Sequence, residues 1–381
     1  MTQRLTSALG LSLLMLTLVG AVQAKGKAAD KPPAGDSEYR AGWVAFVAPA
    51  LDTKTANPTD ARQRARESAI GHFEAAVAAN PKQVAYQASL TYVCLSAAKY
   101  QKAKAAIDAA IQGERRDPLL YVMRGQAEAA LAQMDPVSAG KNIGPAITAF
   151  DRAAQLDPKN SLPLLQAASV AFDVDRLDLA TPRLKQALER QETWLYRLPV
   201  PTDLHAEKGN ALRIWEQIQL SAWSGLLARC QNVANSALRL GAQEERLGNL
   251  EAAESYFRQA YEVGRKVGRV EPHLFISVGT AIDILDRVYP ALARLATARS
   301  DTAQAERWEG EAGVLQIGRG ELQAAVSEYL AAVKAKPPAG VEAMLRMEAE
   351  HVGRVFRGIG LGSSPPAAPK PAEAPGASPS R

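Results

Sequence analysis

Histidine and cysteine are the usual nitrogen and sulfur ligands of zinc in proteins, and their spacing shows whether a zinc site is encoded. The four histidines, His72, His205, His273 and His351, are isolated from one another. None lies one helical turn from a second histidine or beside a pair of cysteines, which is the spacing that zinc sites need. The sequence therefore predicts no metal site and no cofactor.

The sequence motifs of familiar enzyme classes are also absent. The chain has no GxSxG, GxxxxGK or HExxH segment. Gly358, Gly360 and Gly362 superficially resemble a phosphate-binding loop, but they follow an expected helix, so we interpret them as a helix exit. The acidic residues at 244–254 have ordinary ion-pair spacing on a helix. We expect a protein that is not an enzyme.

The first 24 residues have the form of a secretory signal peptide. Arg4 precedes an apolar run from Leu5 to Val19, and Val22 and Ala24 occupy the −3 and −1 positions of a cleavage site. The run is short for a membrane span, so we expect cleavage after Ala24 and export to the periplasm or the medium. An uncleaved anchor helix is the alternative. The chain lacks an acceptor for N-glycosylation, which favours a bacterial periplasm.

The ends of the mature chain and its charge limit the kinds of partner that we expect. Residues 25–37 are expected to form a flexible leader and residues 358–381 a Pro/Ala-rich disordered tail. The most apolar later segment, 273–298, carries four charged residues, so we expect no transmembrane span after signal cleavage. The chain has a net charge of +5 and no block of consecutive basic residues, so we expect no nucleic-acid partner.

The two cysteines lie on apolar helical stripes, Cys94 near Leu90 and Cys230 near Val233. In an oxidising compartment they could pair, because extracellular cysteines often form disulfides. Their apolar neighbours favour buried free thiols instead.

Between its ends the sequence predicts helix almost throughout, because apolar residues recur every three or four positions and no alternating strand pattern appears. Within these helices a small, a large and a second small residue recur at fixed offsets, often followed by a proline. The units that contain Ala69 and Ala103 are 34 residues apart, and an insertion around 134–144 interrupts the third. The signature residues of the six units are Ala69, Phe73, Ala76 and Pro81; Ala103, Ile107 and Ala110; Gly125, Ala146, Phe150, Ala153 and Pro158; Ala180, Leu184 and Ala187; Gly241, Ala253, Phe257 and Ala260; and Gly313, Ala325, Tyr329, Ala332 and Pro337.

These residues resemble the signature of the tetratricopeptide repeat (TPR) family, over roughly residues 60–190 and 235–340. Small residues let helix backbones approach, the large residue fills the space between helices, and proline ends the second helix of a unit. One unit cannot bury its apolar face alone, so units must stack. The resemblance implies an all-α solenoid of antiparallel helix pairs, a TPR-like superhelix.

The signature divides the chain. We expect an N-terminal array at 38–190, a non-consensus helical connector at 191–234 and a C-terminal array at 235–357. The connector contains Trp194, Trp215 and Trp223 and has no repeat signature. Whether the two arrays form one superhelix, or two short arrays joined by longer helices, stays open.

The resemblance also implies a partner-binding groove, because family members hold peptides on the concave surface formed by the first helix of each pair. The residues expected to line it are Tyr92, Leu95, Leu119, Val122, Gln126, Leu162, Leu165 and Phe172. Packing against a neighbouring repeat or against the insertion is the alternative for these side chains. The Lys/Asn clamp of members that hold chaperone C-termini is missing.

The sequence therefore predicts a non-enzymatic protein–protein interaction scaffold of the bacterial cell envelope, which binds a protein or peptide segment in an apolar groove. A structural subunit that self-associates or assembles into an envelope or secretion complex is the second hypothesis. An envelope hydrolase is the third.

Overall fold

The computed structural model describes residues 32–51, 58–202, 204, 211–270 and 274–359. The described residues form fourteen helices and no strand, apart from one isolated bridge between Asn160 and Glu192. The helices are α2 (Asp36–Leu51), α3 (Pro58–Ala79), α4 (Val84–Ser96), α5 (Tyr100–Gly113), α6 (Pro118–Gln133), α7 (Ala139–Asn142), α8 (Gly144–Leu156), α9 (Leu162–Asp173), α10 (Leu177–Glu189), α11 (Ala211–Arg246), α12 (Leu250–Arg269), α13 (Phe275–Ala298), α14 (Thr302–Ala335) and α15 (Val341–Gly358). The expected signal peptide and nearly all of the expected tail lie outside these residues.

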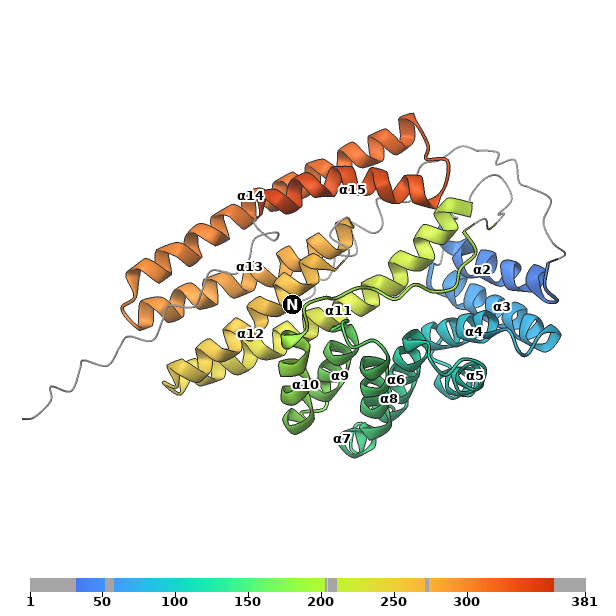
Figure 1. The fold of residues 1–381 in the computed structure, drawn as a ribbon, viewed down its shortest axis with the longest axis horizontal. Helices are drawn as coiled ribbons and strands as arrows, with labels where there is room; N and C mark the ends of the chain where they lie inside the picture. Colours follow the sequence, from blue (N-terminus) through green and yellow to red (C-terminus); the bar gives the residue numbers. More distant parts are fainter. Residues whose placement is uncertain (1–31, 52–57, 203, 205–210, 271–273, 360–381) are drawn as a thin grey trace, which may run out of the picture.

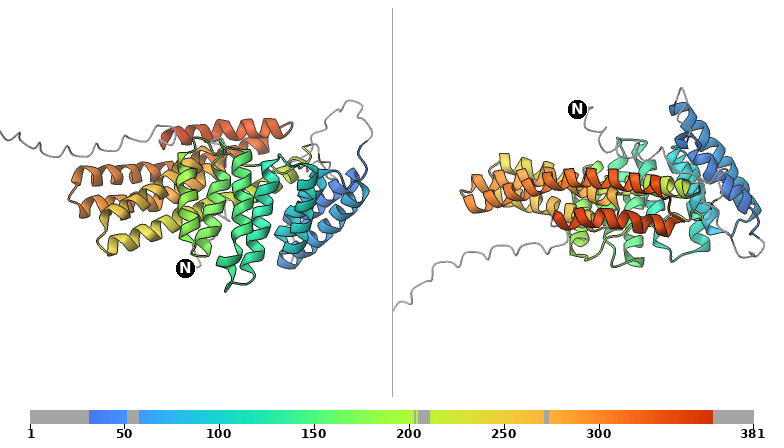
Figure 2. Two further views of the ribbon diagram at one scale, coloured as in Figure 1. Left: turned by 60° about the horizontal axis from the view of Figure 1, so that its bottom comes forward. Right: turned by 90° about the horizontal axis from the view of Figure 1, so that it is seen from above.

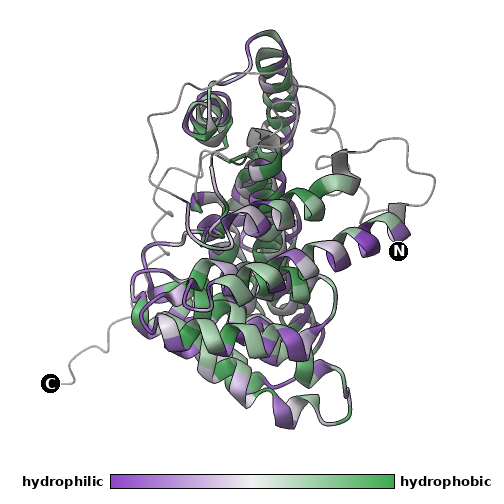
Figure 3. Cartoon of the chain, turned by 90° about the vertical axis from the view of Figure 1, so that its right-hand side faces the viewer, coloured by the Kyte–Doolittle hydropathy of each residue, from purple (hydrophilic) through white to green (hydrophobic). Residues whose placement is uncertain are grey.

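Consecutive helices pack side by side, so the fold is an all-α solenoid of antiparallel helix pairs, as predicted (Figure 1). α2 packs on α3, α4 on α5, α6 on α8 and α9 on α10, and α7 is a short helix in the insertion. We call helices α2 to α10 the first array. Figure 3 shows apolar residues (green) interleaved with hydrophilic ones (purple) along the helices.

The signature residues of the first four units lie where the sequence predicts them. Their small and large helical residues are buried, and Pro81 and Pro158 lie in the turns that follow α3 and α8. A Cβ added at Gly125 would lie 2.7 Å from the Phe150 ring, so this glycine is needed for the close approach of α6 and α8. Gly241 meets Phe257 in the same way across α11 and α12.

The first unit has a first helix that the signature did not assign. α2 packs on α3, and a Cβ at Gly42 would lie 2.8 Å from the Phe73 ring. Gly42 therefore has the role in the first pair that Gly125 has in the third. The expected leader at 25–37 overlaps the start of this helix, since α2 begins at Asp36.

The stretch expected to be a helical connector differs from that expectation. Its described part up to Thr202 is extended, and α11 then runs from Ala211 through the expected boundary at 234 to Arg246. Pro199 and Pro201 explain the extended part, because proline removes a helical donor and restricts the residue before it.

The last predicted unit is also different, because one helix replaces the expected pair. Gly313 and Ala325 both lie in α14, and a Cβ at Gly313 would meet nothing within 4 Å. The segment between them contains no proline, and α14 continues through Gly318 and Gly320 without a break. Ala325 and Tyr329 are nevertheless buried, and Pro337 follows the end of the helix.

Long helices form the second half of the protein. α12 packs on α11, α13 on α12 and α14 on α13, and α15 packs mainly on α14 (Figure 2). Gly248, with a φ of 81°, makes the turn between α11 and α12. A search of the described helices for one long and apolar enough to cross a membrane finds none.

Two glycine-to-alanine variants test this packing. Gly125→Ala should lower the free energy of unfolding by about 1–3 kcal/mol, because its methyl group must displace the Phe150 ring. Gly310→Ala is the matched control in α14, where the methyl group meets open space and should stabilise by about 0.5–1 kcal/mol. Urea denaturation measures both. Equal effects at the two positions would contradict the packing.

Candidate peptide-binding surface

The residues predicted to line the groove lie together on the first helices of the first array, but none of them is fully exposed. Val122, Leu162, Leu165 and Phe172 are buried, and Leu165 has no exposed surface. Tyr92, Leu95, Leu119 and Gln126 are partly buried. The structure therefore brings the predicted residues to one side of the array and covers that side.

The cover comes partly from α11, which crosses the first array (Figure 1). The Gln166 side chain of α9 donates to the carbonyl of Leu226 in α11 at 3.1 Å. On α4, burial raises the pKa of the Tyr92 hydroxyl, and a hydrogen bond with Ser221 of α11 partly opposes this rise. These covering residues are neither a neighbouring repeat nor the insertion. The tip of that insertion is exposed, as at Val137.

The rest of the cover is an extended segment, residues 191–202, which we call the resident segment. Two side-chain amides hold its backbone. Asn160, just before α9, donates to the Trp194 carbonyl at 3.1 Å and accepts from the Trp194 amide at 3.2 Å. Gln219 of α11 donates to the Leu198 carbonyl at 2.8 Å and accepts from the Leu198 amide at 3.2 Å. Each amide thus satisfies both main-chain groups of one residue, as a neighbouring β-strand would.

The side chains of the resident segment divide between the inside and the solvent. Leu195, Tyr196 and Leu198 are buried, and Arg197 between them is exposed. The Tyr196 hydroxyl donates to the Asp157 carboxylate at 2.9 Å, and burial raises the pKa of this hydroxyl. The indole of Trp223 donates to the Tyr196 carbonyl at 3.2 Å. The surface therefore contacts both the backbone and particular side chains of the resident segment.

Both ends of the resident segment are fixed to the first array. At its start, the guanidinium of Arg190 donates to the carbonyls of Ala154, Asp157 and Asn160 at 2.7–3.1 Å, which caps the end of α8. Near its other end, the Tyr39 hydroxyl of α2 donates to the Pro199 carbonyl. The segment thus runs from the last pair of the array back to the first.

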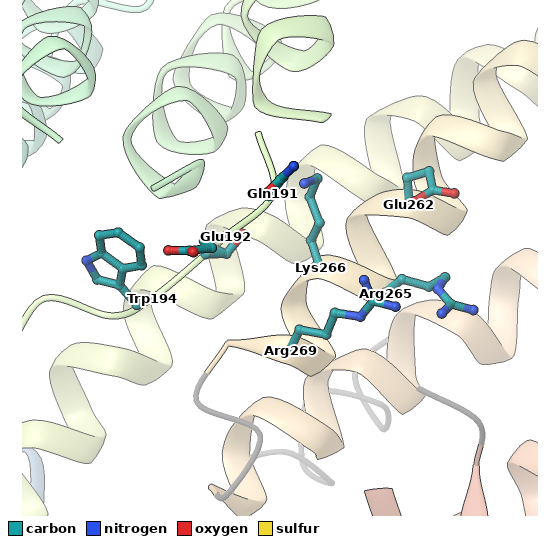
Figure 4. Close-up of a pocket in the computed structure, with 8 residues that line it drawn as sticks. Gln191, Glu192, Trp194, Glu262, Arg265, Lys266 and Arg269 are labelled. Atoms are coloured by element: carbon teal, nitrogen blue, oxygen red, sulfur yellow. The ribbon is translucent and has the colours of Figure 1, made fainter. Parts of the chain in front are cut away.

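A pocket of about 340 Å³ lies where the resident segment meets α12 (Figure 4). Gln191, Glu192, Thr193 and Trp194 line one side, and Glu262, Arg265, Lys266 and Arg269 line the other. Lys266 donates to the Arg190 carbonyl, and burial lowers the pKa of its ammonium group. Arg265 is buried and donates to the Tyr261 hydroxyl at 3.0 Å. The hydrogen bond from Lys266 joins the residue before the segment to α12.

The histidines of the described residues have structural contacts. His72 Nδ1 lies 2.7 Å from Glu38 Oε2, which joins α3 to α2, and His351 Nδ1 bonds to the Met347 carbonyl at 2.7 Å. His205 and His273 lie outside the described part of the chain. Within that part, no three histidine, cysteine or acidic residues are grouped as metal ligands.

Both cysteines are free and buried. Burial raises the pKa of the Cys94 thiol to about 11 and that of the Cys230 thiol to about 12. Since the thiolate is the reactive form, neither group is suited to act as a nucleophile near neutral pH.

Comparison with known proteins finds little. No protein-family model matches the chain, and no curated protein matches it. Among solved structures, the chain is similar to a thermophilic TPR protein of Thermus thermophilus, with 16% sequence identity and a TM-score of 0.35. The match covers 68% of this chain and 99% of the other.

Sequence reasoning missed the polar residues that hold the resident segment, namely Tyr39, Asn160, Arg190 and Gln219. The available signal was local: two prolines, Pro199 and Pro201, follow the apolar and aromatic residues 194–198. That pattern predicts an extended segment that has to bury its side chains.

Removing one amide should loosen the resident segment. Gln219→Ala leaves the buried Leu198 amide without an acceptor and removes one of the two donors to the Leu198 carbonyl, which also accepts from the Val200 amide. It should cost about 1–3 kcal/mol of unfolding free energy. Gln323→Ala, on the exposed side of α14, is the control and should change it by less than about 0.5 kcal/mol. Chemical denaturation measures both, and a neutral Gln219→Ala would contradict the pairing.

The buried thiols give a pH-dependent prediction. Both pKa values lie above the ordinary value of 9.0, so the thiols stay protonated at pH 8 and should not react with Ellman's reagent while the protein is folded. Two thiols per chain should react at once in guanidinium. Rapid reaction of either thiol in the native protein would contradict its burial.

Proposed function

We propose that this protein is a non-enzymatic scaffold that binds a segment of another protein on the concave side of its first array. The observation that carries the proposal is that this side already holds an extended segment by backbone pairing, through Asn160 and Gln219. Such pairing suits an extended peptide, since main-chain groups supply affinity whatever the sequence. The TPR-like fold is also one that typically serves binding rather than catalysis.

The proposal includes export to the cell envelope. Residues 1–24 lie outside the described part of the chain, and their charged, apolar and small-residue pattern supports a cleaved signal peptide. The spread of charge along the chain supports a protein partner rather than a nucleic acid.

A structural subunit that self-associates is the second candidate. The outer side of α14 favours it, because Val314 and Ile317 are exposed there beside Gly313, and Ile317 is 67% exposed. Light scattering on the purified mature chain separates this candidate from a scaffold that acts as a monomer.

Photo-crosslinking in the producing organism tests the scaffold directly. A photoreactive phenylalanine analogue at Gln126, a predicted groove position on α6, should crosslink to a specific partner in the exported fraction. The same analogue at Ala109, exposed on α5, is the matched control and should not. Crosslinks from both positions alike, or from neither, would count against the concave side as the binding surface.

A further inference from the structure

The resident segment defines the kind of ligand that its surface accepts. Seven of its backbone and side-chain groups have specific partners: the amide and carbonyl of Trp194 and of Leu198, the Tyr196 hydroxyl and carbonyl, and the Pro199 carbonyl. Leu195 and Leu198 supply the buried apolar contacts. The fitted ligand is an extended strand with the order Leu-Tyr-x-Leu-Pro, in which x is the exposed Arg197, whose guanidinium carbon lies 5.8 Å from the centre of the Trp223 ring.

The attachment of this segment is local rather than part of a cooperative element. Residues 194–202 belong to no helix and no strand ladder. Two of their positions, Pro199 and Pro201, have no amide hydrogen to pair. The segment could therefore leave the surface by breaking a few side-chain contacts, without unwinding α9 or α11.

The chain's own residues leave part of the concave side unsatisfied. The Tyr86 hydroxyl of α4 is buried and has no hydrogen-bond partner among the described residues. Its ring lies 4.7 Å from the ring of Tyr39, which holds the Pro199 carbonyl. On α9, Ser169 Oγ and Gln166 Oε1 are likewise buried without a partner in the described part of the chain. An unpaired buried polar group is unfavourable. A ligand that forms a hydrogen bond with the Tyr86 hydroxyl would therefore bind this surface more tightly than the resident segment does.

We propose that the concave side exchanges its resident segment for an extended partner segment of the same Leu-Tyr-x-Leu-Pro chemistry. This inference rests on the proposed scaffold function and names both the partner class and its regulation. The resident segment is tethered at a high effective concentration, so it holds the surface closed to weak ligands. A partner's apparent affinity is then reduced by the small fraction of molecules in which the segment is detached.

A labelled synthetic peptide of residues 191–202 is the probe, used with the mature chain in fluorescence anisotropy. Leu195→Ser with Leu198→Ser weakens the resident segment and should raise the affinity for the probe at least tenfold over the unmodified chain. Thr202→Ser, at an exposed position of the same segment, should leave the affinity unchanged. Adding Gln219→Ala to the leucine variant should lower the affinity again, because the probe then loses one backbone pair.

The proposal is overturned if the leucine variant keeps its helical circular dichroism and does not bind the probe more tightly. It is also overturned if the unmodified chain forms dimers whose assembly depends on Leu195 and Leu198, because a second copy would then supply the segment. If crosslinks from Gln126 are found and the probe does not bind, the proposed replacement of the resident segment is wrong, and the scaffold function is still supported.

If the leucine variant does not fold, amide hydrogen exchange of the unmodified chain tests whether the resident segment detaches by itself. The amides of Trp194 and Leu198 should exchange faster than those inside α9 and α11, because the segment opens by itself. Exchange of these two amides only at the rate of the buried helices would overturn the proposal.

Discussion

The first helices of the first array are too apolar to face water on their inner side, and this constraint organises the rest of the molecule. α9 shows it most clearly, because every residue from Leu162 to Phe172 is buried. A helix that is apolar on all sides needs neighbours on all sides, and its own pair supplies only some of them. The preceding helix α8, the resident segment and α11 supply the others. The covering of this surface accounts for the course of the chain after α10.

The length of α11 follows from the same constraint. Its first half crosses the first array, where Gln219, Ser221 and Leu226 make contacts with the resident segment, α4 and α9. Its second half forms a helix pair with α12, with Gly241 against Phe257. One helix therefore belongs to both halves of the protein. The lysine and arginine residues of α12 then meet the start of the resident segment at the pocket of Figure 4.

The sequence was sufficient to predict the helix pairs and insufficient to predict what covers them. Phe73 and Phe150 could be placed because each occupies a fixed offset within one unit. Contacts such as Gln166 with Leu226 join residues 60 positions apart and have no periodic signal. Gly313 shows the opposite error, because a small residue at the right offset also suits the exposed side of a long helix. The predicted groove residues lie on α4, α6 and α9, and part of what covers them is a segment that no repeat encodes.

An engineered disulfide tests most directly whether the resident segment covers the first helices of the first array. Ser161 and Thr193 side chains are in contact, so Ser161→Cys with Thr193→Cys should form a disulfide on mild oxidation of the folded protein. Ser161→Cys with Thr202→Cys is the control pair, since Thr202 lies at the far end of the segment. Peptide mass spectrometry identifies the bond. The account predicts a 161–193 disulfide and no 161–202 disulfide; equal formation of both, or of neither, would contradict it.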